Sequence, residues 1–351
     1  MILVGCRKTI SKGKKTENIF LFISVAFIYL NCIMRASSVG RDLQGYREVY
    51  LLTNNIPFND FSYVYFEKGY IFLMKICVVM KLPFQGFLAF VYAIVMIPIF
   101  TFICHNSQNK LFSVLIYVCY INFEMSLSAL RQAISVSIVL LAFDVLLNCR
   151  KRKLSALLSV GLVFLAATFH TSAIVVIPFF FLSGVIQSVV RYVCVLAIGT
   201  VFGMFGRIYI FDLLKNLFKD EVINFNGEIH IGGNIEFMCA ITIGCLVLYY
   251  KAKENTKFNL KKNSFLLKAY LFGIIVLLFF GDANASRSYL FFGITGTVLI
   301  PNFIANFKLR NKIITESGFV IFLAAFFYFK TLKANNLDIV PYQFFWNELG
   351  K

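Results

Sequence analysis

The stretch "LVFLAATFHTSAIVVIPFFF", residues 162 to 181, decides how this chain is organised. It places one imidazole, His170, inside an apolar run that has no other ionisable group between residues 154 and 182. A single helix over those residues would be ~43 Å long, whereas the hydrocarbon core of a bilayer is ~30 Å thick. We therefore expect the helix to break at residues 170 to 172, with one span before the break and one after it, and with the imidazole at the outer boundary.

The composition of the whole chain extends this interpretation. Of 351 residues, 59% are hydrophobic and 15% are charged, and the mean hydropathy is +0.78. A soluble domain cannot bury so much apolar surface, so the solvent is lipid. Alternating strands of about ten residues, which would predict a transmembrane barrel, do not occur. The sequence predicts an all-α polytopic membrane protein, in which residues 1–351 form a single membrane domain.

We expect about 11 transmembrane helices, because eleven apolar runs separate the polar segments. The runs fall at roughly 19–34, 86–105, 111–124, 128–149, 154–169, 172–187, 189–206, 236–250, 264–281, 287–306 and 313–330. A further run, 69–84, holds Lys75 at its centre, where insertion costs about 2.5–3.5 kcal/mol. We predict that this run is a re-entrant segment.

Charge placement supports the re-entrant segment. With it, the N-terminus and the basic loops at 150–153, 251–262 and 308–312 all face the cytoplasm, as the positive-inside rule requires. The C-terminus then faces outward. An equivalent count results if 111–124 is the incomplete span instead. Because the cations sit in short clusters between apolar runs, the net charge of +17 is a topology signal, and no nucleic-acid partner is expected.

This topology leaves three segments outside: a large first loop at 35–68, a second loop at 207–235, and the tail at 331–351. The nine cysteines show no metal-ligand spacing, and most lie inside apolar runs, where they pack. No cluster of carboxylates indicates a divalent metal either. We therefore expect no metal site and no cofactor.

Unusual polar residues gather at the outer end of the predicted bundle. Arg131 and Gln132 lie about one turn inside the start of a span, where an arginine facing lipid is costly. Arg131 either extends to the outer headgroups or binds a phosphate or pyrophosphate, which its rigid fork of donors suits. His170 is either a hydrogen-bonded interface histidine or an acid, base or phosphate ligand. Arg287 follows Asp282 at another outer helix start and is either an anchor or a second anion ligand.

The first outer loop is rich in aromatic and charged side chains. They include Arg41, Asp42, Tyr46, Tyr50, Tyr63, Tyr65, Phe66, Glu67 and Tyr70. Aromatic rings with carboxylates indicate a sugar-binding surface, but an interfacial aromatic belt has the same composition. His105 and His230 are isolated in the sequence, and we assign no role to them.

An ordered set of short motifs resembles the Wzy-type polysaccharide polymerases of bacterial surface glycans (O-antigen and capsule), and in particular the EpsG-like family. The set consists of Arg41-Asp42 with Tyr46, Glu67-x-Gly69-Tyr70, Leu130-Arg131-Gln132-x-Ile134, Phe169-His170-x-Ser172-Ala173 with Pro178, Arg287 followed by Tyr289-Leu290-Phe291, and Pro341-Tyr342. Each motif is short, and their order over most of the chain carries the specificity.

The resemblance implies a multi-pass enzyme of the bacterial cytoplasmic (inner) membrane that joins undecaprenyl-pyrophosphate-linked oligosaccharides at the outer face. It implies a metal-independent glycosyl transfer, with membrane lipid and a chain-length regulator as further partners. Arg131, Gln132, Arg287, Arg41, Tyr46, Tyr70 and Tyr342 would bind pyrophosphate and substrate. His170, Glu67 or Asp42 would take the proton of the acceptor hydroxyl, and among these we favour His170 or Glu67.

Three other functions stay open at this point. A flippase for the same lipid-linked glycan needs a polar path through the bilayer midplane, but the ionisable residues cluster at span ends, with Asp144 the main exception. A membrane O-acyltransferase would also use Arg and His near the outer face. A scaffold subunit would use none of these residues chemically.

Overall fold

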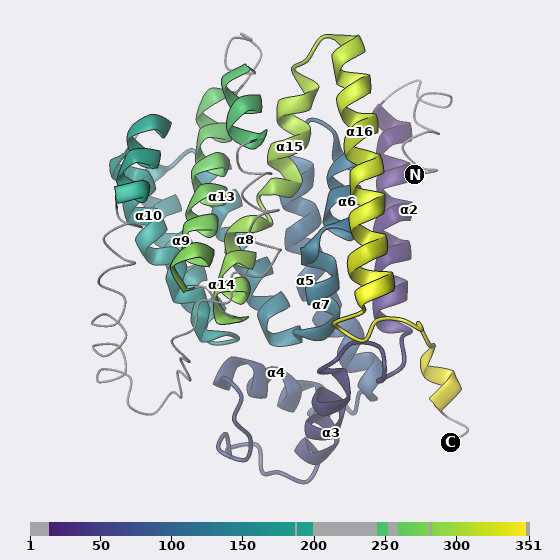
Figure 1. The fold of residues 1–351 in the computed structure, drawn as a ribbon. Coiled ribbons are helices and arrows are strands. Elements are labelled where there is room, and N and C mark those ends of the chain that lie inside the picture. Colours follow the sequence, from purple (N-terminus) through teal and green to yellow (C-terminus); the bar gives the residue numbers. More distant parts are fainter. Residues whose placement is uncertain (1–13, 187, 199–243, 252–258, 281–282, 349–351) are drawn as a thin grey trace. The chain divides into compact units, whose positions relative to one another are not determined.

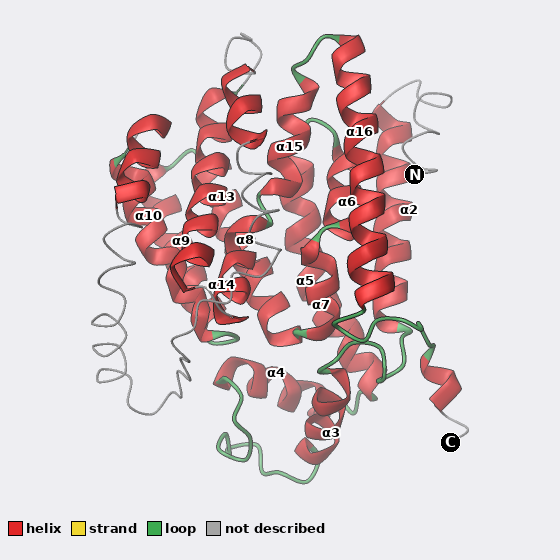
Figure 2. Cartoon of the chain, in the orientation of Figure 1, coloured by secondary structure: helices red, strands yellow, loops and turns green. Residues whose placement is uncertain are grey.

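The protein is described by a computed structural model that covers residues 14–186, 188–198, 244–251, 259–280 and 283–348. Every regular element in these ranges is helical, and a single isolated bridge, between Arg35 and Phe344, is the only extended pairing within them (Figure 2). The predicted all-α class is therefore confirmed for the part of the chain that the structure describes. The predicted outer loop at 207–235 lies outside the described residues.

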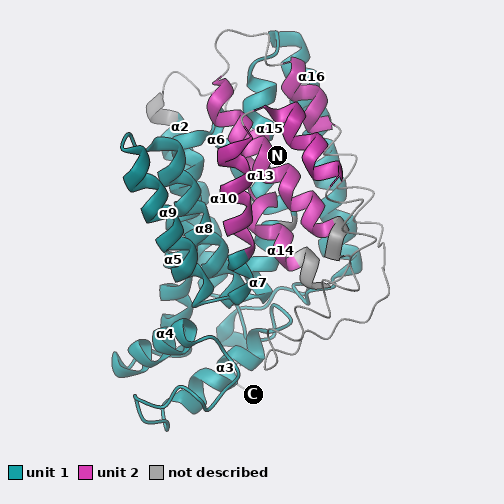
Figure 3. Ribbon diagram, turned by 90° about the vertical axis from the view of Figure 1, so that its left-hand side faces the viewer, with its two compact units in different colours: residues 1–174, 300–351 teal, residues 175–299 magenta. Residues whose placement is uncertain are grey.

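The chain divides into two compact units (Figure 3). The first comprises residues 1–174 and 300–351, and the second residues 175–299. In the first unit the helices are α2 (Lys14–Ile33), α3 (Leu43–Thr53), α4 (Lys68–Val79), α5 (Phe84–Asn106), α6 (Lys110–Cys119), α7 (Ile121–Ser128), α8 (Leu130–Asn148), α9 (Arg152–Ala167), α16 (Leu309–Phe327), the π-helical turn η2 (Tyr328–Ala334) and the 3-10 turn η3 (Phe345–Glu348). That residues 1–351 form one domain stays a prediction.

The second unit follows the 3-10 turn η1 (Thr171–Val175). It contains α10 (Val176–Val185), α13 (Leu260–Phe280) and α14 (Ala283–Gly293), and α15 (Gly296–Ala305) begins in it. Helix α13 packs on α10 and α14. Gly273 permits the close approach to α14, because a Cβ there would lie 2.6 Å from the Cβ of Phe292. Lys268 caps the end of α10 by donating to the carbonyl oxygen of Ile186 at 2.7 Å.

Within the described ranges, four helices are long and apolar enough to cross a membrane. They are Phe84–Asn106, Leu130–Asn148, Arg287–Ala305 and Leu309–Ala334. A fifth span results if Lys110–Cys119 and Asn122–Ser128, which are bent by 52° at the break between them, act together. Shorter apolar helices occur at Glu17–Ile33, Thr171–Val185 and Val189–Ile198. The structure thus shows a multi-pass arrangement, and the count of about 11 spans is not confirmed.

The predicted re-entrant run 69–84 forms a short helix. With 12 residues, α4 is ~18 Å long, well below the ~30 Å of a hydrocarbon core. Lys75 is buried on it, and its Nζ donates to the carbonyl oxygen of Pro57 at 2.6 Å. The rings of Phe61 and Tyr63 lie 5.5 Å and 5.1 Å from the same nitrogen. The first outer loop therefore covers the lysine, which removes the cost of placing its charge in lipid.

Helices α3 and α4 lie together beyond one end of α5, α8 and α9 (Figures 1 and 3). This is the end at which α9 stops at Ala167 and the 3-10 turn η1 begins at Thr171. The expected break near His170 is confirmed, because α9 and α10 are separate helices with that residue between them. The first unit therefore brings the first outer loop and the His170 break to the same end.

Candidate functional site

A single carboxylate, that of Glu67, joins two residues that are far away in the sequence. Its Oε1 lies 3.0 Å from Nδ1 of His170, and its Oε2 accepts a short hydrogen bond from Nη1 of Arg131. All three side chains are mostly buried: 14% of the Glu67 side chain is exposed, 16% of His170 and 24% of Arg131. All three belong to the first unit, so the guanidinium of Arg131 and the imidazole of His170, which the sequence predicts separately, meet at one carboxylate.

Gly69 explains how Glu67 reaches His170. Its N–H donates to the carbonyl oxygen of Thr168 at 2.9 Å, so the first turn of α4 rests directly on the end of α9. A Cβ at Gly69 would lie 2.7 Å from that same oxygen, a separation that real side chains do not tolerate. Only glycine permits this approach. It places Glu67, the residue before α4, beside His170, three residues after the end of α9.

Arg131 is held from three sides. It lies in the first turn of α8, which is separated from α7 by Ala129 alone. Its Nε donates to the hydroxyl of Tyr46 on α3 at 3.4 Å, and its guanidinium lies 4.4 Å from the ring centre of Phe66. Together with Glu67, these contacts keep the cation on the protein instead of in lipid. We call Tyr46, Glu67, Arg131 and His170 the Glu67 cluster.

Aromatic rings line the cluster. The ring of Tyr70 lies 5.6 Å from that of Tyr46 and 5.7 Å from that of Phe66, edge to face in both pairs. Tyr70 is fully buried, and its hydroxyl has no hydrogen-bond partner among the described residues. Because an unpaired buried hydroxyl is unfavourable, this atom is suited to a bond with a bound polar group.

The electrostatics of the cluster favour a charged carboxylate. Burial alone would raise the pKa of Glu67, but the hydrogen bond from His170 and the charge of Arg131 outweigh it, so the pKa lies below its ordinary value. Burial raises the pKa of Tyr46, against the lowering effect of Arg131. Glu67 is therefore ionised and Tyr46 neutral at neutral pH.

Ionised Glu67 also fixes the protonation of the imidazole. A carboxylate can only accept hydrogen bonds, so Nδ1 of His170 carries the hydrogen that it shares with Glu67. In the neutral ring Nε2 is then left with its lone pair. The arrangement can accept a proton at Nε2, while Arg131, which has five N–H groups, keeps donors for an anion.

Other predicted site residues lie elsewhere in the first unit. Arg41 and Asp338 form an exposed ion pair at 3.4 Å. Asp42 is exposed and precedes α3, where its charge acts on the pKa of Tyr46. The hydroxyl of Tyr342 donates to the carbonyl oxygen of Asn31 at 2.6 Å. The contacts of Arg41 and Tyr342 do not involve the Glu67 cluster, and Asp42 acts on it only through Tyr46.

For two further predicted residues, Gln132 and Arg287, the structure gives the helix on which each lies and its burial. Gln132 is buried on α8 beside Arg131. Arg287 is exposed on α14, in the second unit, and Asp282 lies outside the described residues. That Arg287 joins Arg131 and His170 in one pocket therefore stays a prediction.

Sequence reasoning missed Arg35. The residue is fully buried, and its Nη2 donates to the hydroxyl of Tyr92 at 2.8 Å while Nη1 donates to the carbonyl oxygens of Val39 and Leu127. Its hydrogen-bond acceptors are neutral oxygens, and through Leu127 it fixes the segment just before α8 and Arg131. The only signal in the sequence is an arginine at the end of an apolar run, which ordinarily indicates a headgroup anchor.

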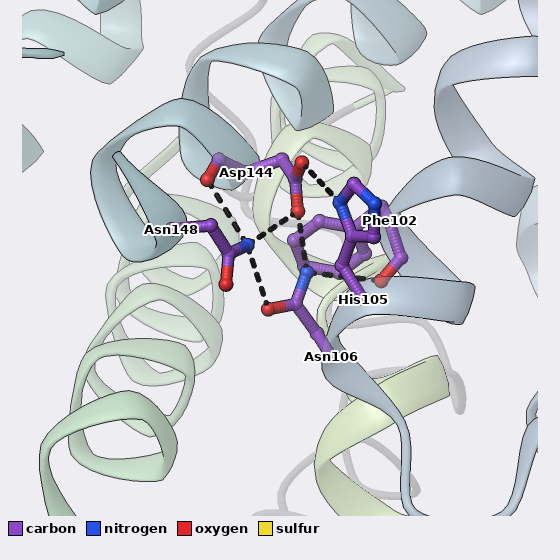
Figure 4. A network of polar contacts seen from close by, with 5 residues as sticks. All are labelled: Phe102, His105, Asn106, Asp144 and Asn148. Atoms are coloured by element: carbon purple, nitrogen blue, oxygen red, sulfur yellow. Dashed lines mark hydrogen bonds and ion pairs between the residues drawn. The ribbon is translucent and has the colours of Figure 1, made fainter. Parts of the chain in front are cut away.

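A second polar network, also missed, occupies the other end of α8 (Figure 4). Asp144 accepts from Asn106 and Asn148 at 2.7 Å each, and its other oxygen lies 2.8 Å from Nδ1 of His105. Thirteen residues of α8 separate it from Arg131, which is ~20 Å along the helix. Residues at 105–106 and 144–148 contact one another because α5 and α8 pack side by side, which neither segment reveals alone.

Metal ligands do not gather within the described ranges, where no group of three or more His, Cys, Asp or Glu side chains could hold an ion. The expectation that no metal or cofactor is needed stays a prediction, since absence from these residues does not test it.

Together the apolar helices and the buried ion cluster at one bundle end define a multi-pass membrane protein that carries a polar site. A family model described as the EpsG family matches residues 18–344, and the chain belongs to this family. Neither a curated protein nor a solved structure matches. Membership identifies a polysaccharide polymerase-like membrane protein of a glycosyltransferase-like kind.

Proposed function

We propose that this protein joins lipid-linked oligosaccharide repeat units into a polysaccharide at the outer face of the bacterial cytoplasmic membrane. The lipid carrier in this proposal is undecaprenyl pyrophosphate. The observation that carries the proposal is the bridge of Glu67 between Arg131 and His170, because glycosyl transfer from a pyrophosphate needs an anion ligand and a proton acceptor side by side.

In the proposed reaction, the hydroxyl oxygen of the acceptor repeat attacks the anomeric carbon of the growing glycan. The bond between that carbon and the pyrophosphate oxygen breaks, and its electron pair leaves with the lipid pyrophosphate. The hydroxyl proton moves to Nε2 of His170. Arg131 stabilises the negative charge that develops on the leaving group.

Glu67 has a supporting role in this scheme. Its bond to Nδ1 holds the imidazole with Nε2 free, and its charge stabilises the imidazolium that forms. Glu67 is thus a positioning residue, and His170 is the base. Asp42, the other base considered from the sequence, has no contact with His170 or Arg131 in the structure.

The Asp144 network bears on the flippase alternative. A transport path needs polar groups that are open to the substrate near the bilayer midplane. Asp144 lies one turn from the end of α8, 7% exposed, with its oxygens engaged by three side chains. This supports a role in packing and favours the polymerase over the flippase.

Deleting the gene and separating the surface glycan on a gel tests the proposal. We expect glycan that carries a single repeat and no ladder, restored by the wild-type gene. Complete loss of glycan would instead identify a flippase, and an unchanged ladder with altered acetylation would identify an acyltransferase. A fully unchanged glycan would leave only the scaffold function, and each of these three results overturns the polymerase.

A further inference from the structure

Hydrogen bonds hold the residues that follow α16 against the rest of the first unit. Asn335 closes a turn, because its Oδ1 accepts from the N–H groups of Ile339 and Val340 at 2.9 Å and 3.0 Å. Beyond the turn, the backbone pairs with the residues that follow α2, through Ala36 N–H to Gln343 O at 2.8 Å and Phe345 N–H to Met34 O at 2.9 Å. The end of the described chain is therefore fixed on the first unit.

Two side chains add to this bracing. The Glu348 carboxylate accepts from the hydroxyl of Ser37 at 3.0 Å and from the N–H of Ser38 at 3.2 Å. Directly opposite Phe344, in the isolated bridge, lies the fully buried Arg35. A surface formed here is held in one conformation, so binding to it requires little ordering of the protein.

That surface is aromatic and exposed. Tyr342, Phe344 and Trp346 alternate along the segment, and we call them the tail platform. The rings of Phe344 and Trp346 are stacked, with an angle of 8° between their planes and 4.3 Å between their centres. Phe344 is 37% and Trp346 44% exposed, so two stacked rings show part of their surface to whatever surrounds the segment.

The platform shares its segment with an exposed ion pair, which places this segment outside the hydrocarbon core. The same paired segment holds the Arg41–Asp338 ion pair, whose side chains are 57% and 58% exposed, beside backbone bonds from Gly40 to Asp338 and from Arg41 to Leu337. An exposed ion pair lies in water or among headgroups, because hydrocarbon excludes it. Burial in hydrocarbon therefore does not explain why these aromatic rings are exposed.

We propose that the tail platform binds the growing glycan, whose sugar rings stack on Trp346. A pyranose has an apolar face of C–H groups that packs on an aromatic ring, and hydroxyls around its edge that need polar partners. Trp346 supplies the flat apolar surface, and Asn347, exposed beside it, supplies an amide. The choice of a glycan rests on the proposed function, since a polymerase must hold a chain of sugars between additions.

The chain offers a direct readout, because Trp346 is its only tryptophan. The full-length protein is placed in lipid nanodiscs and titrated with the polysaccharide released by mild acid from the surface of the same strain. We expect a saturable change in tryptophan fluorescence and efficient quenching by aqueous iodide. No change with the polysaccharide, together with strong quenching by brominated phospholipid, would show an interfacial anchor and overturn the proposal.

Matched variants at the same position separate stacking from anchoring in the cell. Trp346→Phe keeps an aromatic face, whereas Trp346→Leu keeps an apolar side chain without one. We expect Trp346→Leu to weaken glycan retention by roughly two- to tenfold, as for the loss of one aromatic pair, and to shift the ladder to shorter chains relative to Trp346→Phe. Equal ladders from the two variants at equal protein levels would overturn the proposal.

These results are distinguishable from failure of the proposed function. If deletion of the gene leaves the ladder intact, the polymerase fails, whatever the fluorescence shows. If deletion abolishes the ladder but the polysaccharide leaves the fluorescence unchanged, only the tail platform fails.

Discussion

At the scale of single residues, the site depends on one carboxylate that serves two partners. Each oxygen of Glu67 has its own contact, Oε1 with His170 and Oε2 with Arg131. The cation and the imidazole therefore share one negative charge instead of each carrying its own counter-ion. Changes at any of the three residues are expected to affect the other two.

Replacing Arg131 with lysine tests whether geometry or charge matters. Lysine keeps the charge, but one ammonium cannot hold Glu67, Tyr46 and a pyrophosphate as the guanidinium fork does. We expect the initial rate of polymer formation to fall by roughly 100-fold, measured from lipid-linked repeats in proteoliposomes. Arg150→Lys, at an exposed position before α9, is the matched control and should leave the rate unchanged. A wild-type rate for Arg131→Lys would show that a point charge is sufficient.

Glu67→Gln gives a prediction about pH. The pKa of Glu67 is lowered in the folded protein, so its ionisation stabilises the fold at any pH above its ordinary value of 4.5, and that stabilisation is lost as the pH falls through the lowered pKa. Arg131 and His170 are the charged or titratable groups that face it.

We therefore expect Glu67→Gln to lower stability by about 1–3 kcal/mol at pH 7, with the difference from wild type disappearing only below pH 4.5. Thermal unfolding in detergent at a series of pH values measures it. Glu48→Gln, on the exposed face of α3, serves as control. A difference that vanishes between pH 7 and pH 5 would contradict the lowered pKa.

At the scale of helices, the first turn of α4 on the end of α9 is the contact that assembles the site. The sequence predicts the break near His170 from length alone, and it predicts that 69–84 is not an ordinary span from Lys75. It does not predict that α4 rests on α9, because that contact depends on a missing side chain at Gly69 and on the backbone carbonyl of Thr168, and a hydropathy pattern shows neither.

Gly69→Ala tests this contact. The added Cβ would collide with the backbone of Thr168, so the N-terminus of α4 must move away and take Glu67 from His170. We expect a loss of at least about 1–3 kcal/mol of stability and a strongly reduced ladder. Gly161→Ala is the matched control within α9, because a Cβ there would meet nothing within 4 Å. We expect this variant to be as stable as wild type or more stable by about 0.5–1 kcal/mol. Equal behaviour of the two variants would rule out the close-packing role.

At the scale of the whole molecule, helix α8 connects two polar clusters of different kinds. Arg131 near its start belongs to the Glu67 cluster, and Asp144 near its end belongs to the network with His105, Asn106 and Asn148. The second network fixes α8 to α5, which are neighbours along most of their lengths.

Asp144→Ala separates packing from transport. Removal of the carboxylate takes an acceptor from the buried amide of Asn106 and from the exposed side chains of His105 and Asn148, and we expect a loss of about 1–3 kcal/mol of stability. Polymer formation per folded molecule should stay at the wild-type level, because Asp144 is ~20 Å from the proposed chemistry. Asp144→Asn retains one acceptor oxygen and should lose less stability. Normal stability with abolished glycan export would instead indicate a transport path.

The predicted orientation can be tested without reference to activity. A reporter fused after residue 153 follows the basic run at 150–153, which the positive-inside rule assigns to the cytoplasm. We expect a cytoplasmic signal there and an outer signal after residue 228. An outer signal after residue 153 would reverse the predicted topology, and with it the side on which the Glu67 cluster lies.

Much of the fold class and part of the site could be predicted from sequence, for physical reasons. Charged and titratable residues within apolar runs, such as Arg131 and His170, are costly in lipid and are recognisable for that reason. Glu67 was itself predicted as a site residue, but its pairing with both of them could not be predicted, since it lies 64 residues from Arg131 and 103 from His170 and nothing local fixes such a pairing. Arg35 and His105 escaped notice because their partners, Tyr92 and backbone carbonyls for Arg35 and Asp144 for His105, lie on other helices or in loops.

The pairing between the residues after α2 and those after α16 has a consequence for biosynthesis. About three hundred residues separate Ala36 from Gln343, so this pairing cannot form until the chain between them has been synthesised. Until then, Arg35 and its neighbours lack the backbone partners that the segment after α16 supplies. A chain that ends before Gln343 would lack this pairing, and the residues that follow α2 would be left without these backbone partners.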